Sequence, residues 1–341
     1  MSGQRGPSTS RSKDRPAEQA RTRPSDGSPN TSAGAITGRA PAPAAHRAAG
    51  SETYPVQSPT DPTRRAFLTG AGAIAAGLAV YSGAVARHEI DETHHTVSLP
   101  SLGSGFHGLR ITQISDIHLD EYTEPFFLER VVARVNGLAP DLVLLTGDFV
   151  TRGSLTFVAA NHAAGRCAEI LSTLRCPSSL AILGNHDVTV GSALVTGALG
   201  SRGIPVLRNT FVDLTRGGDS LTIAGTADPG TDIPDLALSI PERPRGPVLL
   251  MTHAPDYADV VLAHPRGLNV QFILAGHSHG GQIRLPVLGP LVLPPGGRKY
   301  VQGPYTLGHI HLYVNRGIGT VGLPFRLNCP PEISTFTLQP A

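Results

Sequence analysis

The stretch Val270-Gln271-Phe272-Ile273-Leu274-Ala275-Gly276-His277-Ser278-His279-Gly280-Gly281 joins a continuous apolar run to two histidines set among glycines. An apolar run of this length that ends at glycine predicts a buried strand. The residues that follow such a strand lie at the rim of a sheet, where backbone without side chains lets a ligand approach closely. Because imidazole is the commonest protein ligand for transition metals, the two histidines form a candidate metal site. The alternative is a pair of loop histidines that point apart.

Apolar runs of the same kind occur earlier in the chain, and segments with helical apolar spacing separate them. The predicted strands cover 109–115, 141–145 and 180–183, and the predicted helices between them cover 124–138 and 157–174. Strands that alternate with helices predict a parallel sheet with right-handed crossovers. The carboxyl ends of parallel strands meet at one edge, which is where such sheets bind ligands.

The second half of the chain is richer in strands than in helices. Strands are predicted at 205–207, 211–214, 221–225, 248–251, 310–314 and 333–336, and short helices at 193–202 and 256–263. Gly217-Gly218 is typical of a hairpin turn between the second and third of these strands. This layout predicts an α/β fold in which two sheets pack face to face with helices outside.

Polar residues of one chemical kind follow five of the predicted strands, namely Asp116 and His118, Asp148, Asn185 and His186, His253, and His277 and His279. A single Asp or His at a strand end is usually a turn former, but five successive strand ends of this kind favour a shared site. Oxygen and imidazole donors without thiolates suit Mn, Fe, Zn or Mg-like ions. The donors suffice for two ions with one carboxylate between them. Two ions at roughly 3.5–4 Å can activate water and neutralise the charge of a phosphoryl group.

As a set, these motifs resemble the calcineurin-like metallophosphoesterases. The matching motifs run in family order from about Leu109 to Phe336 and are Asp116-x-His118, Gly147-Asp148, Gly184-Asn185-His186-Asp187, His253 and Gly276-His277-x-His279. The resemblance implies a four-layer sandwich of two mixed β-sheets flanked by helices. Three further stretches, at 280–282, 313–317 and 330–333, resemble the bacterial YkuE/YaeI-type branch. That branch is similar to enzymes that cleave the pyrophosphate of a UDP-diacylated sugar.

The resemblance also implies roles for the motif residues. The first ion would be held by Asp116, His118 and His279, and the second by Asn185, His253 and His277. Asp148 would bridge the two ions. His186 would not be a ligand, because it would face the scissile phosphate and assist the leaving oxygen.

Three residues near the motifs have two interpretations each. Asp187 could orient the imidazole of His186 or could be a turn carboxylate. Arg316 and Arg326 are candidate phosphate contacts, because guanidinium matches phosphate geometry, and the alternative for both is a surface arginine.

The N-terminal part of the chain differs in composition from the rest. Residues 1–62 contain almost no large apolar side chains and are predicted to be disordered. Arg64-Arg65 precedes an uncharged run that ends at Ala84-Val85-Ala86, a small-residue cleavage motif. The paired arginines resemble a twin-arginine (Tat) export signal, and a membrane helix is the alternative because the run has about the ~20 residues that span a bilayer. The predicted divisions are therefore 1–62 disordered, 63–86 signal or anchor, 87–108 linker, and 109–341 metallophosphoesterase domain.

Composition limits the remaining functions. The net charge is +2 and basic residues form no block with aromatics, so nothing favours nucleic-acid binding. Cys167, Cys176 and Cys329 form no Cys-x-x-Cys motif, which favours free thiols over a structural zinc site.

The leading hypothesis is a two-metal hydrolase of a phosphodiester or pyrophosphate in an envelope lipid or nucleotide-linked lipid. The alternatives are a phosphomonoesterase on soluble substrates and a non-catalytic metal-binding interaction protein. The expected partners are a phosphorylated small-molecule or lipid substrate, the Tat machinery and the membrane. The expected location is the cell envelope. The expected ions are Mn or Fe, with Zn as the alternative, because availability in the cytoplasm would select the weaker-binding metals before export of a folded protein.

Overall fold

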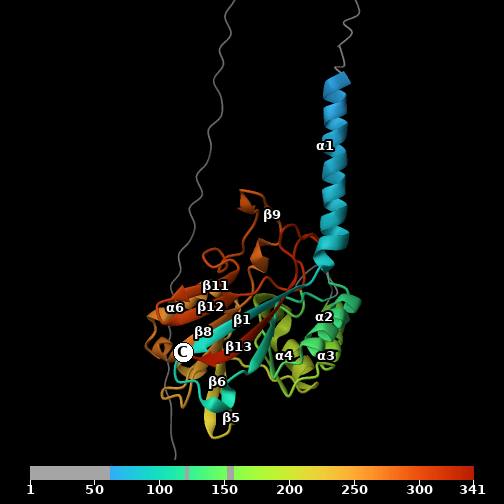
Figure 1. Ribbon diagram of the computed structural model, residues 1–341. Coiled ribbons are helices and arrows are strands. Elements are labelled where there is room, and N and C mark those ends of the chain that lie inside the picture. Colours follow the sequence, from blue (N-terminus) through green and yellow to red (C-terminus); the bar gives the residue numbers. More distant parts are fainter. Residues whose placement is uncertain (1–61, 120–122, 152–156) are drawn as a thin grey trace, which may run out of the picture. The chain divides into compact units, whose positions relative to one another are not determined.

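The computed structural model describes residues 62–119, 123–151 and 157–341. Two mixed β-sheets form the centre of the fold (Figure 1). Residues 1–61 lie outside the described residues, so the disorder predicted for residues 1–62 stays a prediction. The first described element is α1 (Pro62–Val80), which precedes both sheets.

The first sheet has the strand order β1-β13-β2-β3-β4. Its strands are β1 (Asp91–Leu99), β13 (Glu332–Pro340), β2 (Arg110–Ile114), β3 (Leu142–Leu145) and β4 (Ser178–Ala181). The neighbours β2, β3 and β4 are parallel, and β13 runs antiparallel to β2. All four residues of β3 are buried, as expected for a parallel strand covered on both faces.

The second sheet has the strand order β11-β12-β8-β7-β6-β5. Its strands are β11 (Gly303–Leu307), β12 (Ile310–Val314), β8 (Val270–Ala275), β7 (Val248–Met251), β6 (Asp219–Gly225) and β5 (Thr210–Arg216). The four central strands are parallel, and each edge strand is an antiparallel hairpin partner. The predicted turn at Gly217-Gly218 joins β5 to β6, and both glycines have positive φ.

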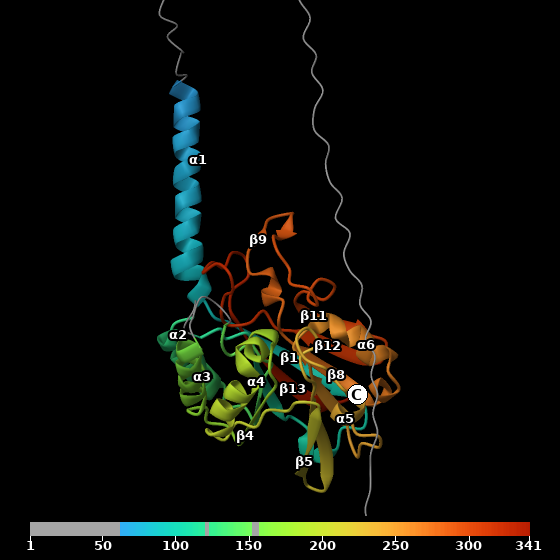
Figure 2. The same cartoon turned by 180° about the vertical axis from the view of Figure 1, so that it is seen from behind.

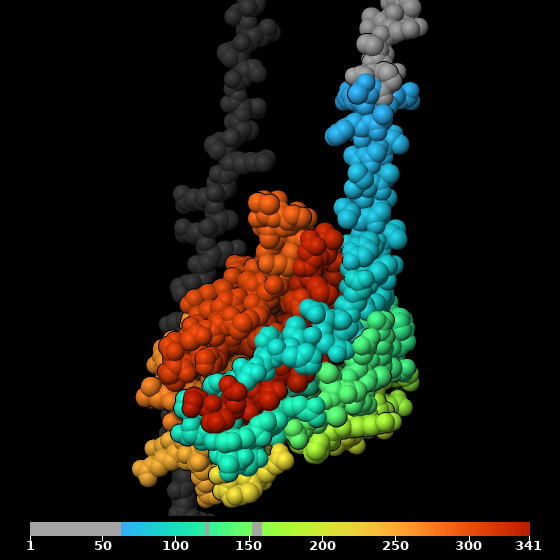
Figure 3. Space-filling view, in the orientation of Figure 1, coloured from blue at the N-terminus to red at the C-terminus, as the bar shows by residue number. Residues whose placement is uncertain are grey.

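A small hairpin leaves the second half of the fold after β8. It consists of β9 (Arg284–Leu285) and β10 (Gly289–Pro290), which pair antiparallel. The hairpin stands out from the surrounding surface (Figure 3). Its side chains therefore have few neighbours, and several large apolar ones are exposed.

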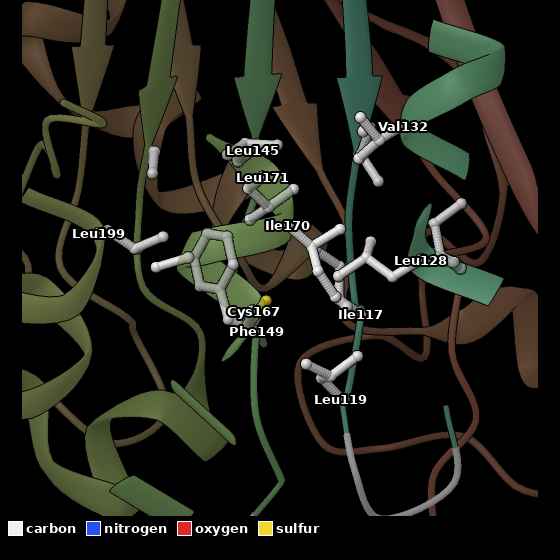
Figure 4. Packing of buried hydrophobic residues seen from close by; sticks show 14 of the residues in the cluster. Ile117, Leu119, Leu128, Val132, Leu145, Phe149, Cys167, Ile170, Leu171 and Leu199 are labelled. Carbon is white, nitrogen blue, oxygen red and sulfur yellow. The ribbon is translucent and has the colours of Figure 1, made fainter. Parts of the chain in front are cut away.

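Three buried apolar clusters establish the layers. The first packs β2 and β3 against α2 (Pro125–Leu138), α3 (Phe157–Leu171) and α4 (Asn185–Gly200). Figure 4 shows this packing, in which Cys167, Ile170 and Leu171 of α3 approach Leu145 and Phe149. The second cluster lies between the two sheets. The third packs the second sheet against α5 (Leu236–Ser239) and α6 (Ala258–Ala263), on the side of the fold away from α2, α3 and α4 (Figure 2). The predicted four-layer sandwich is confirmed.

Several elements differ from the sequence predictions. The segment 87–108 contains β1, which apolar periodicity did not reveal because this polar edge strand pairs with β13 alone. The strands β9, β10 and β11 were also not predicted. The strand predicted at 180–183 lies two residues earlier, and 205–207 contributes a single bridge between Ala181 and Val206. The domain limit at residue 109 stays a prediction. The three cysteines are free thiols, as expected.

Candidate metal centre

The eight predicted site residues all follow strands at their carboxyl ends. Backbone hydrogen bonds tie these strand ends together in pairs. The N–H groups of Ile117 and His118 both donate to the carbonyl of Asp148, at 2.8 and 3.0 Å. In the second sheet, the N–H of Gly276 donates to the carbonyl of His253 at 3.1 Å. The N–H of His277 also donates to the carboxylate of Asp116 at 3.0 Å, so the loops of the two sheets meet at one rim, as expected for the carboxyl ends of parallel strands.

The backbone at this rim is unusual. Left-handed φ values of 51–69° occur at five of the predicted site residues, which are Asp116, His118, Asp148, His277 and His279. Non-glycine residues rarely adopt this conformation, and it costs of the order of 1–3 kcal/mol where the surrounding structure imposes it. Such strain is concentrated at functional sites. Here five such residues occur where the candidate ligands gather.

The side chains form overlapping groups with the spacing of metal ligands. Asp116, His118 and His279 form one group, and Asp148, His253 and His277 form another. Within each group the candidate donor atoms lie within 4.8 Å of one another. A third group contains His186 together with His118 and Asp148, so distance alone does not separate the proposed acid from the ligands.

The imidazoles of the first group are in the state that a metal requires. Burial, opposed by the Asp148 carboxylate, lowers the pKa of His118 to about 3. The pKa of His279 lies well below its usual value, mainly because the ring is buried and also because the guanidinium of Arg326 is close to it. Both rings are therefore neutral at pH 7. Their Nε2 atoms face each other at 3.1 Å, and Nδ1 of His118 lies 2.9 Å from the Thr151 hydroxyl. A neutral ring whose other nitrogen is hydrogen-bonded is a typical metal ligand.

His253 and Asp148 define the second group. Nδ1 of His253 lies 2.7 Å from the carbonyl of Thr146, which fixes the ring. Its Nε2 is aimed at Oδ2 of Asp148, 3.1 Å away. Although burial opposes it, the nearby Asp148 and Asp116 carboxylates raise the pKa of His253 well above its usual value. A positive charge is therefore favoured at this point, whether it is a proton or a metal ion.

Unsatisfied atoms in this region test whether a metal fits. Among the described residues of this region, Asn185 Oδ1 and His279 Nδ1 are buried without a hydrogen-bond partner, and His253 Nε2 has only the Asp148 carboxylate beside it, at 3.1 Å. Buried polar atoms without partners are rare and costly. These three belong to predicted ligands, and their chemistry is the oxygen and imidazole set that divalent transition metals accept. The residues present thus fit a metal centre.

Glycines give the carboxylates their space. A Cβ at Gly184 would overlap Oδ1 of Asp148, and a Cβ at Gly276 would overlap Ser115 Oγ and Asp116 Oδ2. Gly317 has φ 70°, and a Cβ there would lie 2.6 Å from Cβ of Asp116. The glycines near His277 are predicted from the sequence to let a ligand approach closely. At Gly276 the close approach is instead that of the protein's own carboxylate.

We expect Gly276→Ala to displace Asp116. Activity should fall by on the order of 10²-fold, because misplacing a site group by about 1 Å costs that much, and overpacking should cost about 1–3 kcal/mol of stability. Gly137→Ala in α2 is the matched control, since a Cβ there meets nothing within 4 Å. Gly137→Ala should leave activity unchanged and raise the free energy of unfolding by about 0.5–1 kcal/mol, because alanine is more stable than glycine inside a helix. Turnover and thermal denaturation of both variants are the measurements, and full activity of Gly276→Ala would contradict the expectation.

Asp187 has the second of its two predicted roles, that of a turn carboxylate, because it accepts the backbone N–H of Gly184 at the start of α4. Its carboxylate accepts the backbone N–H groups of Asp148, Phe149, Val150 and Gly184, at 2.8–3.2 Å. Burial and the neighbouring Asp148 raise the pKa of Asp187, and the amide donors oppose that rise. Asp187 therefore joins the loop after β3 to the start of α4. The helix predicted at 193–202 in fact begins at Asn185, because Gly191 at φ 144° kinks it and hides its periodicity.

The two arginines considered as phosphate contacts are engaged elsewhere. Arg326 is completely buried, and its guanidinium donates to the carbonyls of Gly319, Cys329, Arg316 and Gly317. Arg316 donates to Glu332 at 3.1 Å and to Asp91 at 2.6 Å. Both arginines hold the loops behind the site. Because Arg326 is buried, the alternative that it is a surface arginine is wrong. Nothing in the sequence around Arg326 indicated its burial.

A cavity of about 370 Å³ opens in front of the candidate metal ligands. Asp148, Asn185, His186, His277 and His279 form its inner end. Its outer wall is apolar and consists of Ile283, Leu291, Val292, Val321 and Leu323. The cavity therefore combines a charged floor with a hydrophobic entrance. The apolar wall has no signature in the sequence, because its residues come from loops without apolar periodicity.

The fold and the site together define a metal-dependent phosphohydrolase. Residues 109–281 match the calcineurin-like phosphoesterase family, and the chain belongs to that family. The clustered His and Asp donors agree with the metal dependence of the family.

Three relatives show the breadth of the similarity. The chain is 36% identical over 288 residues to the uncharacterized metallophosphoesterase YkuE of Bacillus subtilis, covering 81% of this chain and 98% of that protein. It is 34% identical over 236 residues to the phosphodiesterase YaeI of Escherichia coli, covering 67% and 82%. It is 28% identical over 293 residues to the UDP-2,3-diacylglucosamine pyrophosphatase LpxG of Chlamydia trachomatis, covering 69% and 85%. The predicted branch is supported by the first two.

Proposed function

We propose that the chain hydrolyses a phosphodiester or pyrophosphate bond in a lipid-linked substrate of the cell envelope. The observation that carries this proposal is the cavity, which places apolar side chains directly outside the donor groups. A phosphate at the floor and a hydrocarbon chain at the wall would both be accommodated. The names of YaeI, a phosphodiesterase, and LpxG, a pyrophosphatase of a diacylated sugar nucleotide, support the same substrate class.

We propose that two divalent ions occupy the centre. Asp116, His118 and His279 would hold one ion, and Asn185, His253 and His277 the other, with Asp148 between them. When bound, the ions supply Lewis-acid chemistry that offsets phosphoryl charge and makes water a better nucleophile. His186 lines the cavity beside Asp148 and would give a proton to the leaving oxygen. The edge of its ring packs against His118, with centroids 4.9 Å apart, which orients it.

A substrate screen tests the reaction class. The purified protein is incubated with Mn²⁺ and with matched phosphomonoesters, phosphodiesters and pyrophosphates, each with a short and a long acyl or alkyl group. We expect the diesters or pyrophosphates with long chains to give the highest kcat/KM, because the apolar wall binds the chain. A preference for short-chain monoesters would favour the soluble phosphomonoesterase alternative and would overturn the proposal.

We propose that the protein is exported through the Tat pathway and stays anchored in the membrane, facing outward. The helical segment 63–88 is long and apolar enough to span a membrane, by length and composition only. The cleavage motif at Ala84-Val85-Ala86 is helical, and Ala86 is buried. Next to it, the carbonyl of Ser82 accepts the N–H of Arg326 at 3.1 Å. Packing of this segment favours a retained anchor over a cleaved signal.

We expect the double variant Arg64→Lys, Arg65→Lys to accumulate inside the cell, because ammonium does not replace a pair that is read by its guanidinium groups. Loading in the cytoplasm would also favour Mn²⁺ or Fe²⁺, which bind more weakly than Zn²⁺ or Cu²⁺. Fractionation followed by immunoblotting, with Arg202→Lys as the control, is the measurement. Normal export of the double variant would contradict both the Tat signal and this reason for the choice of metal.

A further inference from the structure

The hairpin β9–β10 and the adjacent loop expose an unusual set of apolar side chains. Val287 is fully exposed, Leu288 and Val292 expose 77% and 79% of their surface, and Leu291 and Leu323 are more than half exposed. We call these five residues the apolar rim. Single exposed apolar residues are common, but a contiguous group of large ones marks a binding surface.

The apolar rim continues into the active-site cavity. Leu291, Val292 and Leu323 line the cavity that also contains His186, His277 and His279. Val287 and Leu288 lie at the tip of the hairpin, outside the cavity. Val287 has φ 68°, and the N–H of Leu288 donates to the carbonyl of Pro286 at 2.8 Å, so the tip is a tight turn that presents both side chains outward. The entrance to the candidate metal site is therefore continuous with an exposed apolar surface.

Charge does not select the partner of the apolar rim. Residues 260–331 contain no Asp or Glu and contain five Arg and one Lys, but Arg326 is buried, and Arg316 and Lys299 pair with carboxylates from other parts of the chain. The apolar side chains therefore carry the argument, because large exposed apolar groups are typical of a surface that enters the interface of a bilayer.

The end of the candidate membrane helix packs beside the base of the apolar rim. Leu78, Ala79 and Ser82 share a small cavity with Ile283, Phe325 and Leu327. Ile283 also lines the active-site cavity, and its carbonyl accepts the N–H of Leu291 at 3.1 Å. The chain thus leaves α1 within contact distance of the segments that carry the rim.

We propose that the apolar rim inserts into the membrane and places the mouth of the metal site on the bilayer surface. A lipid-linked phosphoester would then enter the cavity from the membrane without passing through water. The occupant of this surface is the bilayer and not a second copy of the chain, because the end of the candidate membrane helix packs against the base of the same surface. This proposal deepens the proposed function, but its test does not depend on catalysis.

The chain contains no tryptophan, so one introduced tryptophan is a unique fluorescent reporter. The full chain with Leu288→Trp is reconstituted in vesicles of phosphatidylcholine and phosphatidylglycerol, with and without brominated acyl chains. We expect emission at shorter wavelength and strong quenching by the brominated lipid. Leu268→Trp is the matched control, because Leu268 is 71% exposed but precedes β8 and so lies at the opposite edge of the sheet. It should show neither effect.

Ile74→Trp in α1 reports insertion of the helix itself. Quenching at residue 74 without quenching at residue 288 would overturn the proposal, as would the absence of quenching at both. Short-wavelength emission at residue 288 that brominated lipid leaves unchanged would also overturn it, and would indicate a second copy or another protein on the rim. The same samples are also assayed with a water-soluble phosphodiester. Hydrolysis without quenching at residue 288 would contradict insertion of the apolar rim but leave the proposed hydrolase activity in place.

Discussion

Asp148→Asn is expected to abolish metal binding and activity together. Oδ1 of Asp148 accepts the N–H of His186 at 2.9 Å, and Oδ2 lies 3.1 Å from His253 and 3.6 Å from His118. Asp148 therefore contacts residues of both proposed ligand groups, and its oxygens approach His118 and His253 more closely than Asp116 approaches His253, at 4.0 Å. An amide has the same shape but no charge, so it cannot offset two dications. Turnover should fall by on the order of 10³-fold or more, because metal stabilisation of the transition state is worth several kcal/mol.

Metal analysis and phosphodiesterase assay of the purified variant are the measurements. Asp259→Asn is the matched control, because this exposed carboxylate only pairs with Lys299 and Tyr300. It should change stability by no more than about 1 kcal/mol and leave the metal content unchanged. Two ions per chain and normal turnover in Asp148→Asn would show that the bridging assignment is wrong.

His186→Ala should separate chemistry from metal binding. The backbone N–H of residue 186 still donates to Asp148 after the substitution, so the carboxylate keeps its position. We expect both ions to remain and turnover to fall by on the order of 10²–10⁴-fold, the usual contribution of a positioned acid or base. The exposed His162 in α3 provides the control, and His162→Ala should behave like the unmodified protein.

The leaving group distinguishes an acid from a structural residue. A p-nitrophenolate leaves without protonation, whereas an alkoxide needs a proton. The loss of rate in His186→Ala should therefore be much smaller for a p-nitrophenyl diester than for an alkyl diester. An equal loss for both substrates would argue against proton transfer. Loss of a metal ion would instead place His186 among the ligands, in the group that it forms with His118 and Asp148.

The sequence predicted the central strands well because their burial leaves a continuous apolar signal. The strands β7, β8 and β12 have the bounds expected from their apolar runs. The edge strand β1 was missed for the opposite reason. Its sequence, Asp-Glu-Thr-His-His-Thr-Val-Ser-Leu, is mostly polar and has no apolar periodicity. Only its pairing with β13 in three dimensions shows that it is a strand.

The candidate ligands were also predictable, because each follows a strand whose end the sequence marks. The positions of the supporting groups were not. Asp187 next to His186 gave no sign that its carboxylate would bind four backbone amides. The apolar wall of the cavity depends on loops after β8 and β12, which come together only in three dimensions. Local sequence patterns carry no information about such contacts.

Metal stoichiometry coupled to activity tests the two-metal centre most directly. The full chain is purified, stripped with a chelator and reconstituted with increasing Mn²⁺, and bound metal and phosphodiester hydrolysis are followed together. We predict that stripping removes all activity and that recovery is complete only when two ions are bound per chain. Full hydrolysis by the stripped protein, or full recovery with a single ion, would contradict the two-metal centre.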